Sequence, residues 1–168
     1  MANANILISK TGYGYAIKVE GRANMDCSPA LKNFGENITQ GAFSKISFDM
    51  TACRWMDSTF MGTLAMLGLK AKKAGISIEM LNMDEKNRGL IRDLGIEGLF
   101  NFAASSDSSF DSSSTKNLTD SDSSQRATAE TILEAHKTLA EVNDANAQKF
   151  GKVIEMVKKD IEDSPKEN

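Results

Sequence analysis

The sequence predicts an α/β fold, in which a mixed β-sheet is flanked by helices and followed by a C-terminal helical extension. Three observations lead to this prediction. Short apolar runs alternate with stretches of helical periodicity over about the first hundred residues, which is typical of a sheet with helices packed on it. A segment rich in serine and aspartate then interrupts the apolar pattern. Beyond it, a single apolar stripe at helical spacing continues almost to the last residue.

The composition narrows the class of protein before any motif is considered. The 168 residues are enough for one domain and an appendage, and 40% are hydrophobic and 26% charged, which is ordinary for a soluble protein. The net charge is -3 and no basic block is present, so direct binding of nucleic acid is not expected. Neither a secretion signal nor a membrane span is recognisable, so we expect a cytoplasmic protein.

The cysteines and the lone histidine do not suggest a cofactor. Cys27 and Cys53 are the two cysteines, and without a secretion signal they are expected to be buried thiols rather than a disulfide. The single histidine, His136, lies far from both in the sequence. We therefore expect neither a metal site nor a bound cofactor.

The elements are expected in the order β-β-α-β-α-β-α-β, which gives a sheet of four to five strands. A helix begins at Pro29, which needs no amide hydrogen in a first turn. Asp84 is a suitable N-cap for a later helix, while Gly75 and Gly95 end two helices. Strands are expected at residues 5–10, 15–20, 45–50, 76–82 and 99–102, and the later helices at residues 60–74 and 85–94.

The chain divides into three parts. Residues 1–102 hold the α/β domain. Residues 103–126 are mostly serine and aspartate and are expected to be a flexible linker, because they bury too little apolar area to offset the entropy of ordering. Residues 127–163 predict an amphipathic helix, or a helical hairpin if the chain breaks at residues 143–146. We favour the break, with Asp144 capping the second helix. The stripe must be buried on the domain, within the hairpin, or in a homodimer.

The stretch W-M-D-S-T-F-M-G, residues 55–62, stands where a strand would lead into a helix. If the helix begins near Thr59 or Phe60, Ser58 lies at or beside the N-cap, where a serine normally accepts an amide hydrogen bond. The same position also suits a modification, because a phosphate there gains the exposed amides and the positive end of the helix dipole. These residues alone leave both interpretations open.

No catalytic constellation is apparent in the sequence. His136 lies in the C-terminal segment and is expected to be a packing residue, so no Ser–His or Cys–His relay can be proposed within the domain. The glycine pair at residues 12–14 precedes a strand rather than a helix, so it is not a phosphate-binding loop. Asp107 and Asp111 are paired acids, but they fall in the expected linker. An enzyme is therefore not expected.

The order of motifs resembles the STAS domain, a family best known from bacterial anti-sigma factor antagonists. The likeness covers about residues 5–102. It is carried by Gly21, Asn24, Pro29, Leu31, residues 46–49, Met56, Asp57, Ser58, Thr59, Gly62, Leu64, Ala74, Gly75, residues 80–82, Leu90, residues 94–96, Leu99 and Phe100.

The resemblance implies a non-enzymatic signalling role in transcription regulation. Members of the family bind an anti-sigma factor, often itself a serine kinase, and a PP2C-type phosphatase reverses the phosphorylation. By position, the phosphorylated residue would be Ser58, with Thr59 as the second choice. The resemblance thus implies a phosphoprotein whose partner binding is switched at Ser58. The alternative is a STAS module that acts as a scaffold or assembly subunit without phosphorylation, with the C-terminal helix mediating oligomerisation.

The expected partner-binding surface contains Asn24, Asp26, Asp57, Ser58, Thr59, Phe60 and Met61. Two positions in it differ from the family pattern. Phe60 replaces a glycine that usually follows the D-S-[ST] motif, and Met61 comes next. Asn24 replaces a loop aspartate, with Asp26 two residues on. We therefore expect a more apolar docking surface with one charge fewer.

Overall fold

The computed structural model describes residues 4–37, 43–105, 115–120 and 124–164. Within these residues a seven-stranded β-sheet is the central layer. Its strands are β1 (Asn5–Lys10), β2 (Gly14–Ala23), β3 (Lys45–Asp49), β4 (Cys53–Met56), β5 (Ser77–Leu81), β6 (Asn101–Ala103) and β7 (Lys116–Asn117). The helices are α1 (Ser28–Asn37), α2 (Ser58–Lys73), α3 (Glu85–Asp93), α4 (Gln125–Ala140) and α5 (Asp144–Asp163). This arrangement confirms the predicted mixed sheet flanked by helices. Within the described residues the sheet has seven strands rather than the four to five expected, because β4 and β7 were not predicted.

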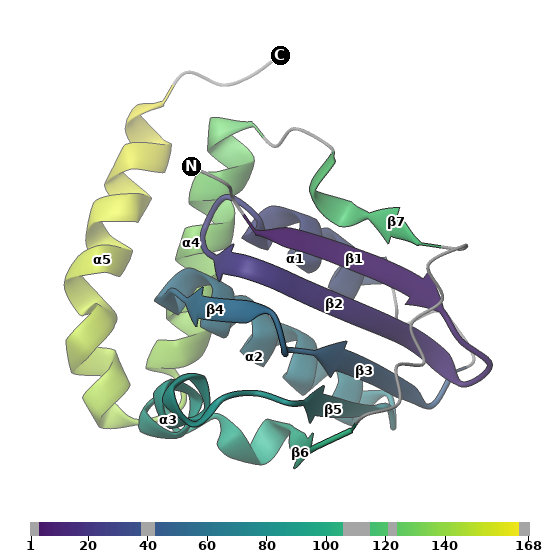
Figure 1. Cartoon of the computed structure of the whole chain (residues 1–168). Coiled ribbons are helices and arrows are strands. Elements are labelled where there is room, and N and C mark those ends of the chain that lie inside the picture. Colours follow the sequence, from purple (N-terminus) through teal and green to yellow (C-terminus); the bar gives the residue numbers. More distant parts are fainter. Residues whose placement is uncertain (1–3, 38–42, 106–114, 121–123, 165–168) are drawn as a thin grey trace.

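The sheet is mixed because its first two strands form a hairpin and the later ones arrive through helical crossovers. The strand order is β6-β5-β3-β2-β1-β7, with β4 pairing β2 off this path. β1 runs antiparallel to β2 and β7, while β2, β3, β5 and β6 are mutually parallel neighbours. α1 connects β2 to β3, and α2 lies between β4 and β5 in the chain, as parallel pairs require. Figure 1 shows α1 and α2 together on one face of the sheet.

β4 is a strand that the local pattern did not predict. Trp55 and Met56 were expected to begin the junction before α2, and residues 53–54 were assigned to no element. Together they form a strand that pairs in parallel with the end of β2, with Trp55 opposite Arg22 and Met56 opposite Ala23. A shift in register at Gly21 and Arg22 lets β2 pair with β3 along its first half and with β4 along its last residues. β4 therefore delivers Asp57 and Ser58 to the C-terminal edge of the sheet.

The core lies between the sheet and the α1–α2 layer. Ile17 and Val19 are fully buried on one face of β2, as their alternation predicts, and Ile46 and Phe48 do the same on β3. α2 is buried over most of its circumference, including Leu64. A helix that is apolar nearly all round needs cover on two sides, and here the sheet supplies one of them.

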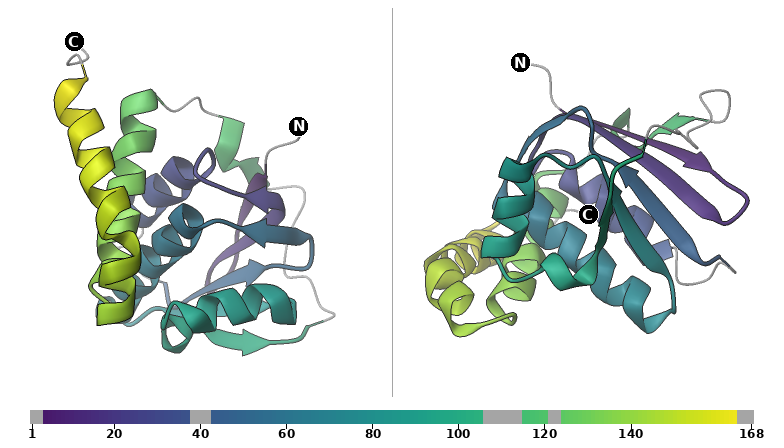
Figure 2. Two further views of the ribbon diagram at one scale, coloured as in Figure 1. Left: turned by 90° about the vertical axis from the view of Figure 1, so that its left-hand side faces the viewer. Right: turned by 60° about the horizontal axis from the view of Figure 1, so that its bottom comes forward.

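The C-terminal segment forms a helical hairpin that supplies the second cover. α4 and α5 run antiparallel, and in Figure 2 (left) α4 lies between α5 and the layer that contains α1 and α2. The chain breaks between them where the sequence predicted. The N-cap of α5 is Asn143, whose side chain accepts from the amide of Asn146 at 2.8 Å, and not Asp144 as expected. Asp144 is the first residue of the helix.

Part of the expected linker is regular structure. Lys116 and Asn117 form β7 on β1, and a 3-10 turn at Leu118–Asp120 follows. Leu118 is partly buried against the core, which anchors this part of the segment. Residues 106–114 and 121–123, including Asp107 and Asp111, lie outside the described residues.

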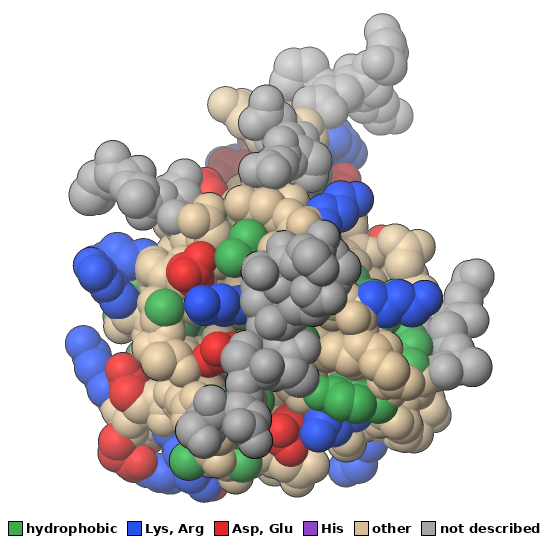
Figure 3. Space-filling model, turned by 45° about the vertical axis from the view of Figure 1, so that its right-hand side comes forward, with side chains coloured by type: hydrophobic (Ala, Val, Ile, Leu, Met, Phe, Trp, Pro, Cys, Tyr) green, Lys and Arg blue, Asp and Glu red, His purple; other side chains and the backbone are tan. Residues whose placement is uncertain are grey.

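The described surface has features consistent with the composition. In Figure 3, lysine and arginine side chains are interspersed with aspartate and glutamate on the face shown, so that face carries no patch of a single charge. Among the described helices, none is both long and apolar enough to cross a membrane. The same described residues contain no cluster of three or more potential metal ligands.

Candidate functional site

Asp57 is the residue that caps α2. Its Oδ1 accepts a hydrogen bond from the amide of Phe60 at 2.8 Å, and its Oδ2 accepts one from the amide of Met25 at 2.8 Å. The carboxylate thus joins the start of α2 to the loop after β2. Burial raises the pKa of the Asp57 carboxyl above its ordinary value, and the hydrogen bonds from the amides of Phe60 and Met25 oppose part of that rise.

Because Asp57 is the cap, Ser58 has no capping role. α2 begins at Ser58 itself, one residue earlier than expected, and the side chain that accepts from the first turn belongs to Asp57. The prediction that Ser58 stands at or beside the N-cap is therefore correct in position, but its capping interpretation is wrong. The hydroxyl is left free to interact outside its own helix, at the end where the helix dipole is positive.

The partner of Ser58 is His136 on α4. Ser58 Oγ lies 2.9 Å from His136 Nε2, although 78 residues separate the two in the chain. His136 Nδ1 lies 2.7 Å from the carbonyl oxygen of Ile132. A carbonyl only accepts, so Nδ1 carries a hydrogen, and in the neutral imidazole Nε2 accepts the hydrogen of the Ser58 hydroxyl.

His136 is held inside the interface between the hairpin and the domain. Its side chain is 4% exposed, and its ring packs on that of Phe150 of α5 with centroids 5.1 Å apart. The expectation that His136 is a packing residue is correct as far as it goes. The sequence did not indicate that the same imidazole also contacts Ser58.

The loop between β2 and α1 borders the site and is organised by Asn24. Its Oδ1 accepts from the amide of Asp26 at 3.0 Å, and its carbonyl oxygen accepts from the hydroxyl of Ser28 at 2.9 Å. An asparagine forms this turn through its own side chain, as an aspartate would. Asp26 and Met25 are exposed, so the loop retains an exposed carboxylate next to Asp57.

Three of the residues expected to contact a partner are buried. Phe60 is 0% and Met61 is 6% exposed, because both lie in the first turns of α2 where the core and the hairpin enclose the helix. The expectation of an apolar docking surface built from these two side chains is therefore wrong for this conformation. Thr59, the second choice for phosphorylation, is also buried. Of the two hydroxyl residues Ser58 and Thr59, Ser58 is therefore the more exposed one, and it is half-buried.

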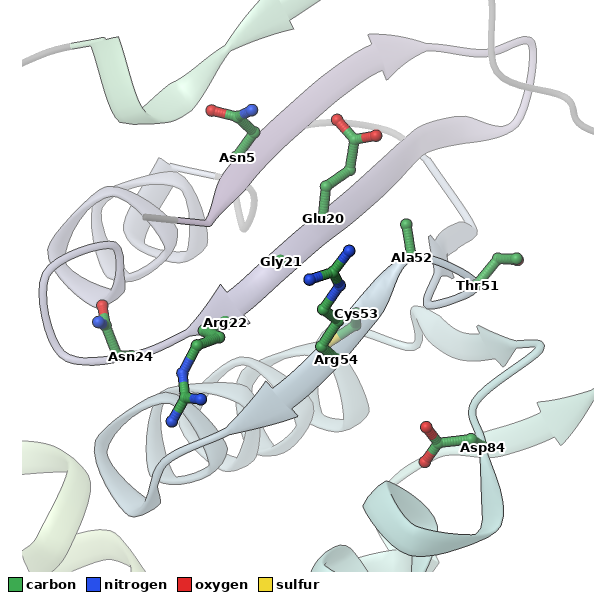
Figure 4. Close-up of a pocket in the computed structure, with 10 residues that line it drawn as sticks. All are labelled: Asn5, Glu20, Gly21, Arg22, Asn24, Thr51, Ala52, Cys53, Arg54 and Asp84. Atoms are coloured by element: carbon green, nitrogen blue, oxygen red, sulfur yellow. The ribbon is translucent and has the colours of Figure 1, made fainter. Parts of the chain in front are cut away.

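An open depression of about 770 Å³ lies on the far side of the same loop. In Figure 4, the Arg54 side chain points across it toward β2, while Glu20 and Asp84 stand at different edges. The guanidinium of Arg22 turns to the Trp55 ring, 4.7 Å from its centroid. The depression is therefore lined by both acidic and basic side chains. Its lining comprises Asn5, Glu20, Gly21, Arg22, Asn24, Thr51, Ala52, Cys53, Arg54 and Asp84. We assign the candidate site to the start of α2 rather than to this depression.

Comparison with solved structures identifies the fold. The chain is similar to the anti-sigma factor antagonist SpoIIAA in its unphosphorylated form, with a TM-score of 0.50 and 17% identity over 62% of this chain and 90% of that chain. The chain has a STAS-like fold. It is also similar to a DUF3478-family protein with a SpoIIAA-like fold from Shewanella loihica PV-4, with a TM-score of 0.45 and 16% identity over 64% of this chain and 91% of that chain. No protein-family model matches the sequence, and neither does any curated protein.

The STAS-like fold confirms the expectation drawn from the motifs and explains why their order was informative. Gly21 lies near the end of β2 and Asn24 follows it, while Asp57 and Ser58 follow β4, so motif residues far apart in the sequence meet at one edge of the sheet. His136 was missed because it belongs to the C-terminal segment, outside the motif. The stripe on that segment indicated that it packs somewhere, but no local pattern pointed to Ser58.

Proposed function

We propose that this STAS-like chain is a non-enzymatic signalling module of the bacterial cytoplasm, which binds a protein partner at the start of α2. By resemblance, the partner is an anti-sigma factor with serine kinase activity, so the module would act in transcription regulation. Phosphorylation of Ser58 would switch the binding, and a PP2C-type phosphatase would reverse it. In the forward step the kinase transfers the γ-phosphoryl group of ATP to Ser58 Oγ, the hydroxyl proton passes to the kinase's base, and ADP leaves.

The observation that carries this proposal is the division of roles between Asp57 and Ser58. Asp57 caps the helix, so the Ser58 hydroxyl can be modified without removing the cap. A phosphate on Ser58 would bring about two negative charges next to the Asp57 carboxylate and to the first amides of α2. The electrostatics of any interface that includes this turn would then change, with repulsion toward an acidic partner and attraction toward a basic one.

A serine beside a histidine could in principle act as a catalytic nucleophile with its general base. Three features of the Ser58–His136 pair support a binding role instead. The Nδ1 of His136 donates to a backbone carbonyl, that of Ile132, rather than to a carboxylate that would stabilise an imidazolium. The imidazole is enclosed by α2, α4 and the Phe150 ring. Ser58 lies at the start of α2 and pairs with a residue of another segment, so the pair depends on the hairpin staying closed.

A scaffold that needs no phosphorylation is the second candidate, because the C-terminal hairpin meets the domain at the turn that carries Ser58. α4 contacts α2 beside Ser58, so the modification site and the C-terminal segment occupy one surface. An assembly subunit would use its hairpin to bind a second copy. The buried Leu139 and Phe150 instead pack within the chain, which supports a role of the hairpin in cis over a homodimer.

The test compares three forms of the full-length chain as bait in native cell extract: wild type, Ser58→Ala and Ser58→Asp. We expect the wild type and Ser58→Ala to retain the same kinase-like protein and Ser58→Asp to retain much less of it. Mass spectrometry of the protein isolated from its own cells should find phosphate on Ser58. Equal retention of one partner by all three forms, together with unmodified Ser58, would rule out the switch and leave the scaffold.

A further inference from the structure

The surface proposed to bind a partner is already occupied by part of the same chain. α4 crosses α2 near the start of α2, where Ser58 Oγ meets His136 Nε2 at 2.9 Å (Figure 1). One helical turn further along α2, Gly62 faces Ala135 of α4. The hairpin thus packs against the turn that carries Ser58.

The backbones of α2 and α4 are in close contact at Gly62, with no room for a side chain between them. A Cβ built on Gly62 would lie 2.6 Å from the carbonyl oxygen of Ala135 and 2.8 Å from its Cβ, which is closer than real Cβ atoms approach. Small residues at such a crossing let the two backbones approach each other. A phosphoryl group on Ser58 Oγ would take the space held by the His136 imidazole, and the backbone contact next to it leaves no slack for α4 to adjust.

The hairpin is attached to the domain by a small number of polar contacts besides this packing. The side-chain amide of Asn146, which is 3% exposed, donates to the carbonyl oxygen of Leu94 in the domain at 2.8 Å, and within the hairpin to that of Leu139 of α4 at 2.9 Å. Lys32 of α1 pairs with Glu134 of α4 at 3.1 Å. None of these contacts is part of the hydrogen-bond ladder of the sheet, so breaking them leaves the strands paired.

We propose that the α4–α5 hairpin is a displaceable cover over Ser58, which competes in cis with the protein partner for the N-terminal half of α2. The proposal rests on the proposed function of Ser58 as the switch. In the closed state the half-buried Ser58 hydroxyl is held by His136, and α4 occupies the face of α2 that the partner would bind. The hairpin opens without unfolding the sheet, and phosphate on Ser58 prevents it from closing again.

The test is amide hydrogen exchange on the full-length chain with Asn146→Ala, a change outside the Ser58–His136 pair that removes the bond to Leu94 on the domain and the bond to Leu139 within the hairpin. Gln148→Ala, an exposed position on the same helix, is the matched control. We expect exchange of the α4 and α5 amides to rise at least about tenfold in Asn146→Ala, while the amides of β2, β3 and β5 keep the wild-type rate. The control should leave both groups unchanged.

A second variant tests whether faster exchange in Asn146→Ala comes from opening of the hairpin or only from the local loss of the Asn146 hydrogen bonds. Gly62→Ala forces the helices apart at the direct contact between α2 and α4, and Gly151→Ala, with nothing within 4 Å of an added Cβ, is its control. Gly62→Ala should also accelerate exchange in α4 and α5. Equal acceleration in the hairpin and the sheet, or none in either, overturns the proposal, because the hairpin would then open only when the whole chain unfolds.

The same variants separate this proposal from the proposed function. The protein that wild-type bait retains in the Ser58 experiment is measured again with Asn146→Ala as bait, and we expect severalfold more of it. An opened hairpin with unchanged retention overturns the cover, even if Ser58→Asp still abolishes binding. A hairpin that opens and increases retention, with no effect of Ser58→Asp, supports the cover and overturns the phosphorylation switch. Exchange rates that depend on protein concentration would show that the cover comes from a second copy, which also overturns the proposal.

Discussion

Gly62→Ala is the substitution whose effect the structure determines most directly. Gly62 lies inside α2, and an added Cβ would meet the carbonyl oxygen of Ala135 at 2.6 Å, its carbonyl carbon at 2.8 Å and its Cβ at 2.8 Å. All three atoms belong to the backbone or the Cβ of α4, so no side-chain rotation relieves the overlap. Either α4 moves away from α2 or α2 shifts in the core, where Phe60 and Leu64 are fully buried.

The magnitude follows from two opposing terms. Replacing glycine by alanine inside a helix stabilises the folded chain by about 1 kcal/mol, through backbone entropy. Forcing extra atoms into a tightly packed contact costs about 1–3 kcal/mol. Gly62→Ala should therefore lower the unfolding free energy by about 0–2 kcal/mol. Gly151→Ala in α5 has nothing within 4 Å of its new Cβ and should raise the unfolding free energy by about 1 kcal/mol.

The difference in unfolding free energy between Gly62→Ala and Gly151→Ala is predicted more precisely than either value alone. Both share the helix-propensity gain, so it cancels and leaves the steric cost of about 1–3 kcal/mol. Urea unfolding followed by circular dichroism measures it, and the fluorescence of Trp55, the one tryptophan of the chain, reports on β4 separately. If Gly62→Ala stabilises the protein as much as Gly151→Ala does, then α4 is not in contact with α2 and the reasoning about the cover fails.

Three further predictions concern the cap, the buried thiols and the Ser58–His136 pair. Asp57→Ala should lower the unfolding free energy by about 1–2 kcal/mol, and Asp57→Asn, which keeps a capping oxygen, should lower it by less. Urea unfolding in which Asp57→Asn is the less stable of the two variants would contradict the capping role. Burial raises the pKa of Cys27 to about 12 and of Cys53 to about 11, so native alkylation at pH 8 should be at least about a hundredfold slower than in the unfolded chain. Because both pKa values are raised in the folded state, the unfolding free energy should also fall as the pH rises above about 9; stability that increases there would refute this assignment. A double-mutant cycle with Ser58→Ala and His136→Ala should give a coupling of about 1 kcal/mol, and additive effects would mean that the two side chains do not interact in solution.

The local pattern of the sequence was sufficient for most of the secondary structure. Alternation along residues 15–20 and 45–50 gave the buried faces of β2 and β3, because side chains on a strand alternate between its two sides. Cap-type residues at 143–146 predicted the break between α4 and α5, although the cap itself moved by one residue to Asn143. The STAS-like order of motifs also came from the sequence alone, because turn and cap residues recur at fixed places in a fold.

Long-range pairing decided what the local pattern left open. Residues 53–56 became a strand because β2 extends far enough to pair with them, which their own composition does not indicate. Lys116 and Asn117 pair with β1 in a segment whose serines and aspartates predict no structure. Both are edge contacts whose hydrogen bonds come from a distant strand, so no window of neighbouring residues contains the signal.

The chemistry of the candidate site divides along the same line. The sequence by itself determined that Asp57 and Ser58 stand at the start of a helix, because a helix N-terminus needs acceptors for its free amides. Only the tertiary structure assigned the cap to Asp57, buried Phe60 and Met61, and set His136 against Ser58 across 78 residues of chain. An amphipathic stripe predicts that one face of a helix is buried, but it does not predict which surface buries it. That surface depends on the complementary shapes of the two elements. Here the small residues Gly62 and Ala135 let α4 pack closely on α2, which places His136 against the hydroxyl of Ser58.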